Sequence, residues 1–123
     1  MNDINVVNNS YIPYGRQTIT SEDINAVEKV LKGEFLTQGK MVPSFENEIS
    51  TRVLAKHAVA FNSATSALHI ACLSLGVGEN DYIWTSPISF VASANCGRLC
   101  GANVDFVDVH PKTGLINLSL IHI

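Results

Sequence analysis

The chain has 123 residues, of which 46% are hydrophobic and 15% are charged. These values predict one domain with an apolar core and argue against a disordered chain. The net charge of −3 gives no reason to expect a nucleic acid or an acidic membrane surface as a partner. No apolar run reaches the roughly 18 residues that a membrane span needs. Three cysteines, without a leader-like segment at the start, predict a cytoplasmic protein.

The spacing of apolar side chains predicts two helices in the first half of the chain. Residues 20–23, Thr-Ser-Glu-Asp, have the pattern of a capping box, and Gly33 ends the helix that begins there. A second helix is expected over residues 41–54, and the segment 34–40 between the two helices is expected to be a loop.

From His57 onward, short apolar runs alternate with helical patterns. The predicted strands are 57–61, 81–85 and 103–109, the predicted helices follow the first two strands, and 111–114 is a turn. The second of these helices is expected to begin with Ser86 as N-cap and Pro87 in the first turn, and to run to about Cys100. This alternation predicts an α/β fold with a mostly parallel sheet, whose ligands bind at the carboxyl ends of the strands.

Two of the strand-to-helix junctions carry residues that could bind a ligand. Ser63, Ala64 and Thr65 could cradle a phosphate through main-chain N–H groups at a helix start, or they could be an ordinary helix cap. Phe90, expected one helical turn after a helix start, could stack on a flat cofactor, or it could be a core aromatic residue. Both interpretations stay open from the pattern alone.

The remaining candidates favour structural roles. Cys96 and Cys100 lie four residues apart on a predicted helix, and no nearby residues complete a metal-ligand set, so packing is the favoured interpretation. Asp105 and Asp108 lie on or just after the third strand, where solvated carboxylates are more common than catalytic ones.

Three segments in order, 36–40, 61–68 and 85–95, resemble the DegT/StrS family of nucleotide-sugar aminotransferases. The resemblance implies the amino-terminal part of the large domain of a fold-type-I enzyme that depends on pyridoxal 5′-phosphate (PLP). It also implies a homodimer that transfers the amino group of glutamate to the C4 ketone of a UDP-linked 4-keto-6-deoxy-N-acetyl sugar, in the biosynthesis of pseudaminic acid or a related cell-surface polysaccharide.

The resemblance also assigns roles to individual residues. It implies that Ala64 and Thr65, with Ser63 beside them, hold the cofactor phosphate and that Phe90 stacks on the pyridine ring. Many relatives have glycine where Ala64 stands, which allows more freedom in φ. The residues implied to line the sugar-nucleotide pocket are Tyr14, Glu34, Phe35, Leu36 and Thr37.

The resemblance also implies that the lysine that forms a Schiff base with PLP lies beyond residue 123, so we expect no catalytic residue in this chain. We therefore expect residues 1–117 to be an N-terminal segment and the first part of a PLP-binding domain, inactive by itself. We interpret residues 118–123 as a tail derived from a sequencing adapter. Two alternatives remain: a PLP-dependent sugar dehydratase of the same family, and a small non-catalytic phosphate- or nucleotide-binding module.

Overall fold

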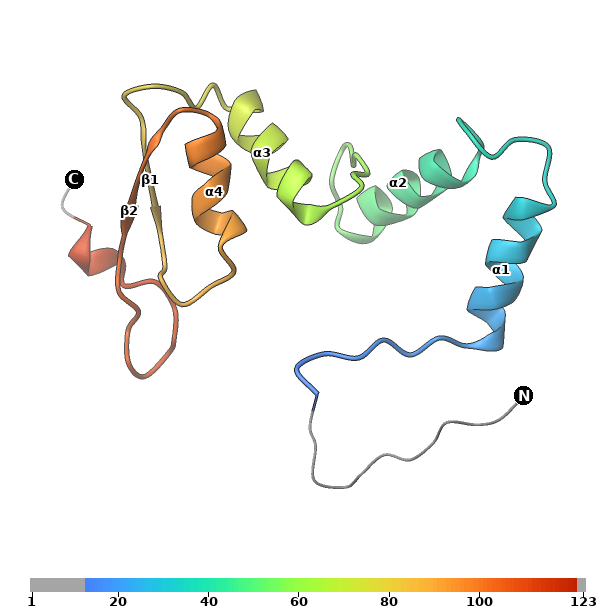
Figure 1. Cartoon of the computed structure of the whole chain (residues 1–123), viewed down its shortest axis with the longest axis horizontal. Helices are drawn as coiled ribbons and strands as arrows, with labels where there is room; N and C mark the ends of the chain where they lie inside the picture. Colours follow the sequence, from blue (N-terminus) through green and yellow to red (C-terminus); the bar gives the residue numbers. More distant parts are fainter. Residues whose placement is uncertain (1–12, 122–123) are drawn as a thin grey trace. The chain divides into compact units, whose positions relative to one another are not determined.

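The computed structural model describes residues 13–121. The chain divides into two compact units, Met1–Ser44 and Phe45–Ile123. The described residues form four α-helices, two β-strands and one short 3₁₀ helix, which are labelled in Figure 1.

The two predicted helices of the first half are confirmed. Helix α1 spans Ser21–Leu31 and begins with the predicted capping box, in which Thr20 and Asp23 each accept a hydrogen bond from the other's backbone N–H. Helix α2 spans Met41–Arg52. The loop between them includes Gly39, where a Cβ would lie 2.8 Å from the carbonyl oxygen of Phe35. The loop therefore closes tightly at a position that only glycine fits.

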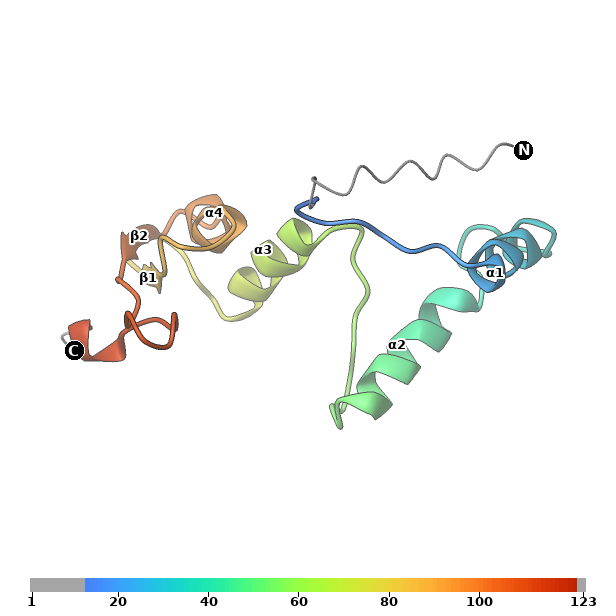
Figure 2. The ribbon, with the colours of Figure 1, turned by 90° about the horizontal axis from the view of Figure 1, so that it is seen from below.

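The second unit has α/β architecture, and its parallel sheet is confirmed. Strand β1 (Tyr82–Thr85) pairs in parallel with strand β2 (Asn103–Phe106), with Tyr82 opposite Asn103. Helix α4 (Ala92–Leu99) is the crossover between the two strands and contacts both of them. Figure 2 shows α4 on one face of the strand pair, and helix α3 (Ala64–Ser74) packs against α4.

Two predicted boundaries of the second unit are wrong. Residues 57–61 do not form a strand, because no strand of the described chain lies beside them to complete a ladder. Helix α4 begins at Ala92, not at Ser86, and its N-cap position Val91 makes no side-chain hydrogen bond. The Ser86 hydroxyl instead accepts a hydrogen bond from the Ile88 N–H at 3.1 Å, which closes a local turn rather than a helix.

The last part of the described chain agrees with the predicted turn. Strand β2 ends at Phe106, three residues earlier than predicted. Gly114 has a φ of +68° in the turn that follows, and Val109 forms an isolated bridge with Ile116. Residues 118–120 of the proposed tail form the 3₁₀ helix η1 (Leu118–Leu120), and His122 and Ile123 lie outside the described residues.

The apolar residues of the described chain are mostly exposed. Only four hydrophobic side chains of residues 13–121 are buried, namely Ala92, Cys96, Ala102 and Val107. Large side chains such as Phe35, Val59 and Leu75 are 65%, 69% and 82% exposed. In this same range, no helix combines the length and the apolar character that crossing a membrane requires.

We predict that the 123-residue chain by itself does not unfold cooperatively, because it buries too little apolar surface to offset the entropy cost of folding. Heating or urea, followed by the fluorescence of Trp84 in β1, should give a broad and featureless curve. A sharp two-state transition of a monomer would contradict this prediction.

Gly97 allows close packing between α4 and β1. A Cβ at this position would lie 2.7 Å from Cδ1 of Ile83. In the longer protein that the sequence analysis predicts, Gly97→Ala should therefore lower the free energy of unfolding by about 1–3 kcal/mol through overpacking. Gly78→Ala is the matched control, since the nearest atom to a Cβ there is 4.0 Å away. Equal urea midpoints for the two variants would show that the contact has no energetic weight.

Candidate functional site

The N-terminus of α3 is built around the side chain of Ser63. Ser63 is the N-cap residue, in extended conformation, and its hydroxyl oxygen accepts a hydrogen bond from the Ser66 N–H at 3.1 Å. The same hydroxyl donates to the Ser66 hydroxyl at 3.0 Å. The capping interpretation of Ser63 is therefore confirmed, and its side chain already satisfies one of the free amides of the first turn.

The two amides between Ser63 and Ser66 have no hydrogen-bond partner in the described part of the chain, and we call them open. Neither the Ala64 N–H nor the Thr65 N–H has a hydrogen-bond acceptor among residues 13–121, and both residues are exposed. They lie at the positive end of the dipole of an 11-residue helix. Two adjacent open donors at such a place can bind a phosphate group.

Alanine at position 64 does not disturb this geometry. Ala64 is the first residue of α3 and is absent from the positions with positive φ, which among non-glycine residues are Gln38, Leu54 and Asn80. A right-handed helical residue needs no glycine, so the departure from the family pattern leaves the donor group in place.

Phe90 is exposed and does not belong to the core of the described chain. Its side chain is 75% exposed and lies in the loop between β1 and α4, because the helix begins after it and not before it. Phe90 lines a pocket of about 170 Å³ together with Thr85 at the end of β1 and Phe106 at the end of β2. The pocket therefore lies at the carboxyl edge of the parallel strands, where ligands bind in α/β folds.

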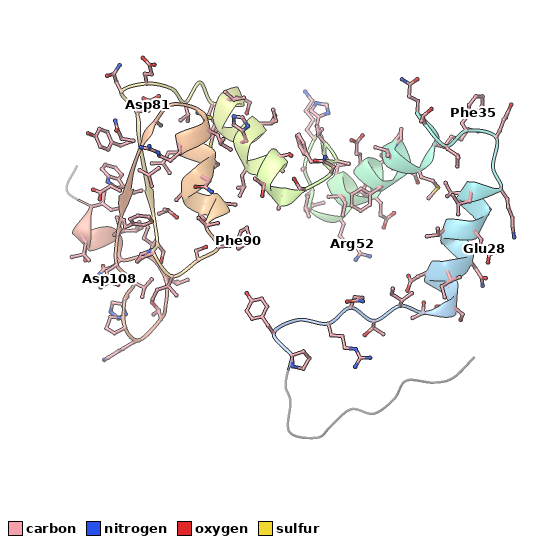
Figure 3. The ribbon with its side chains drawn as sticks, in the orientation of Figure 1. Glu28, Phe35, Arg52, Asp81, Phe90 and Asp108 are labelled. Atoms are coloured by element: carbon pink, nitrogen blue, oxygen red, sulfur yellow. The ribbon has the colours of Figure 1, made fainter. Side chains whose placement is uncertain are left out.

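Residues with hydroxyl groups also line this pocket. Ser86, Ser89 and Ser93 line it, and the hydroxyls of Ser89 and Ser93 lie 3.1 Å apart. Figure 3 shows Phe90 projecting from the loop before α4 toward the side of that helix on which α3 packs. The ring and the hydroxyls offer one apolar face and several polar contacts to a flat polar ligand.

The predicted substrate residues lie in the first unit, and the structure brings only some of them together. A pocket of about 720 Å³ lies between the end of α1 and the start of α2, and Glu34 and Phe35 line it. Leu36, Thr37 and Tyr14 are exposed and do not line this pocket. Lys29 and Lys40 also contribute to the lining, which the motif pattern alone did not indicate.

The three cysteines come together between α3 and α4. Burial, followed by the neighbouring thiols of Cys96 and Cys100, raises the pKa of the Cys72 thiol to about 11. All three cysteines are free, and residues 13–121 contain no group of three or more His, Cys, Asp or Glu side chains that could hold a metal. A protonated thiol packs as a small apolar group, which agrees with the structural interpretation of these residues.

The side chains of the two acids near the third strand make only local hydrogen bonds. The Asp105 and Asp108 carboxylates each accept a hydrogen bond from the N–H of the following residue, at 2.9 Å and 2.7 Å. Both residues are exposed. Their geometry is that of solvated carboxylates, within β2 for Asp105 and after its end for Asp108.

A comparison with protein families shows to which family the chain belongs. A model of the DegT/DnrJ/EryC1/StrS aminotransferase family matches residues 17–122. The chain belongs to this family. The match includes the open amides at the start of α3 and the loop that carries Phe90, so both features occur in an aminotransferase context.

Curated relatives come from several bacteria. A UDP-4-amino-4,6-dideoxy-N-acetyl-beta-L-altrosamine transaminase of Campylobacter jejuni (strain 81-176) is 45% identical over 98 residues, which are 80% of this chain and 26% of the relative. The spore coat polysaccharide biosynthesis protein SpsC of Bacillus subtilis is 39% identical over 85% of this chain and 27% of its own length. The chain thus spans about a quarter of the curated relatives it matches.

Solved structures of this family share the fold. Helicobacter pylori PseC, an aminotransferase involved in the biosynthesis of pseudaminic acid, is 36% identical with a TM-score of 0.79, over 89% of this chain and 31% of that one. The PLP-form of the putative sugar aminotransferase Spr1654 from Streptococcus pneumoniae is 28% identical with a TM-score of 0.83, over 89% of this chain and 28% of its own.

Proposed function

We propose that this chain is the amino-terminal part of a PLP-dependent nucleotide-sugar aminotransferase. The observation that carries the proposal is the pair of open amides of Ala64 and Thr65 at the start of α3, within a chain that matches an aminotransferase family. A phosphomonoester with a flat ring fits this arrangement, because the helix end takes the anion and Phe90 offers an exposed ring.

The residues of this chain bind and orient the cofactor. The main-chain N–H groups of Ala64 and Thr65 donate to the phosphate, and the Ser63 side chain keeps the first turn of α3 in shape. Phe90 covers one face of the pyridine ring. When bound, PLP supplies the electron sink that amino-group transfer needs.

We propose that the substrate is a UDP-linked 4-keto-6-deoxy-N-acetyl sugar and that glutamate is the amino donor, in the biosynthesis of pseudaminic acid or a related surface glycan. The names of the Campylobacter and Helicobacter relatives support this class of sugar. The loop residues Glu34 and Phe35, which line the apolar pocket of the first unit, are suited to the sugar-nucleotide side of the substrate. The remaining proposed substrate residues are Tyr14, Leu36 and Thr37.

We further propose that the complete protein is a cytoplasmic homodimer and that the lysine for the Schiff base lies outside these 123 residues. The many exposed apolar side chains of the described residues support a larger assembly, because such surface is normally covered by the rest of a domain or by a partner. None of Lys29, Lys32, Lys40, Lys56 and Lys112 stands in a motif of the family that would make it catalytic.

Substitution of Ala64 by proline tests the phosphate site directly. Proline lacks the N–H group but suits the first position of a helix, and the extended Ser63 before it (φ −157°, ψ 153°) tolerates a following proline. Ala64→Pro should weaken the binding of PLP to the complete protein roughly ten- to hundred-fold, since one hydrogen bond to a charged group is lost. The measurement is a titration of the cofactor-free protein with PLP.

Ser21→Pro is the matched control for this variant. It places proline at the equivalent first position of α1, after the extended N-cap Thr20, and should leave the PLP affinity unchanged. Far-UV circular dichroism of both variants shows whether the helices are kept. Equal PLP affinities for Ala64→Pro and Ser21→Pro, with helix content intact, would remove the basis of the proposed cofactor site.

The proposed activity predicts a contrast between the chain and the complete protein. The protein made from the full reading frame, supplied with PLP, glutamate and a panel of UDP-linked keto sugars, should release 2-oxoglutarate with at least one 4-keto sugar. The 123-residue chain should release none, because it lacks the nucleophilic lysine. Turnover by the chain alone would refute the assignment of the lysine, and no turnover by the complete protein with any sugar and donor would refute the proposed reaction.

A further inference from the structure

A single carboxylate connects α2 to the segment that leads into the phosphate site. The Ala60 N–H donates a hydrogen bond to Oε1 of Glu46 at 2.8 Å, across 14 positions of sequence. Every other side-chain hydrogen bond between nitrogen or oxygen atoms in residues 13–121 joins positions four or fewer apart. The Glu46–Ala60 bond is therefore a tertiary contact of a kind that the rest of this region lacks.

The Glu46 carboxylate accepts the hydrogen bond that a neighbouring strand would accept if residues 57–61 were part of a sheet. Residues 57–61 are mostly apolar and were expected to pair in a sheet, yet no described strand lies beside them. Ala60 is half-buried, and it has no strand partner among the described residues to accept a hydrogen bond from its N–H group. The Glu46 carboxylate provides this acceptor, and a charged acceptor makes a stronger bond than a neutral one.

The other end of the same segment is also anchored to α2. The helix ends in a Schellman turn, in which the Ala55 N–H donates to the Ser50 carbonyl oxygen at 2.9 Å and Leu54 adopts a φ of +56°. A non-glycine residue with this φ is uncommon, so the direction of the chain after α2 is tightly specified. Residues 55–60 are thus held at both ends by one helix.

The anchored end lies immediately before the phosphate site. Only three positions separate Ala60 from the N-cap Ser63, and Ala64 and Thr65 follow at once. A backbone group fixed at Ala60 limits where the first turn of α3 can lie relative to α2. Loss of this bond would let the segment 57–61 move and would leave the two open amides less well oriented.

We propose that Glu46 is a positioning residue for the phosphate-binding amides of Ala64 and Thr65. The inference rests on the proposed function, since it deepens the cofactor site described above. Glu46 does not touch the cofactor in this account. It acts through the Ala60 N–H and lowers the conformational freedom of the loop that presents the donors.

The test uses three substitutions at Glu46 in the complete protein and one matched control. Glu46→Ala should weaken PLP binding about tenfold. Without the bond to Ala60, the N–H groups of Ala64 and Thr65 are less well oriented toward the phosphate. Glu46→Gln keeps the side-chain length and a carbonyl oxygen as acceptor, so this variant should retain most of the affinity for PLP. Glu48→Ala is the control, since Glu48 lies exposed on the same helix and makes no side-chain hydrogen bond among the described residues.

Two further readouts separate positioning from a general structural role. Amide hydrogen exchange at Ala60 should become faster in Glu46→Ala but not in Glu46→Gln or Glu48→Ala. The turnover number at saturating PLP should stay near that of the natural protein, while the PLP concentration for half-saturation rises. If Glu46→Ala fails to fold, Glu46→Met preserves the side-chain length without the acceptor, and the same measurements apply to it.

The outcomes distinguish this inference from the proposed function. Weak PLP binding in Ala64→Pro but natural affinity in Glu46→Ala or Glu46→Met would overturn the role of Glu46 and leave the cofactor site intact. Natural affinity in all of these variants would overturn both. Equal losses in Glu46→Ala and Glu46→Gln would also overturn the inference, because the glutamine retains the acceptor.

Discussion

The proposed chemistry depends on one property of the helical backbone. The first N–H groups of an α-helix have no carbonyl oxygen behind them, so each must find a side chain, water or a ligand. At the start of α3 the Ser63 hydroxyl satisfies the Ser66 N–H, and the amides of Ala64 and Thr65 remain exposed without an acceptor among residues 13–121. The same residues that stabilise the helix start thus leave two donors free at its positive end, and no cationic side chain is needed to attract a phosphate.

The second constraint is that a parallel sheet needs helices over its faces and further strands beside its edges. Strands β1 and β2 are held by α4 on one face, yet only four hydrophobic side chains of the described residues are buried. The chain spans about a quarter of its curated relatives, and the exposed apolar side chains are the surface that a larger domain would cover. The proposed cofactor site has the same character, because its candidate phosphate donors and aromatic ring lie in these residues, while the lysine for the Schiff base is expected outside them.

The differences between the expected and the observed structure have local causes. The apolar run 57–61 has the composition of a buried strand, but strand formation requires a partner, and composition does not say where the partner is. The Ser86-Pro87 pair has the composition of a helix start, but the Ser86 hydroxyl closes a turn with the Ile88 N–H instead. Helix α4 begins at Ala92, after that turn, and Phe90 is exposed in the loop between them. No sequence pattern indicated the role of Glu46, because its hydrogen-bond partner Ala60 lies 14 positions away.

The sequence by itself determined the features that arise from short-range rules. The capping box at Thr20 and the parallel α/β order were readable from residue type and spacing, because caps, turns and helical periodicity act over a few residues. A cap at Ser63 was one of two interpretations that the sequence left open, and the family was indicated by a resemblance to known sequences. Only the tertiary structure decided that three thiols meet between α3 and α4 and that the Glu46 carboxylate accepts a hydrogen bond from the Ala60 N–H. These facts depend on which groups approach one another across long stretches of chain, and such approach is set by packing rather than by local pattern.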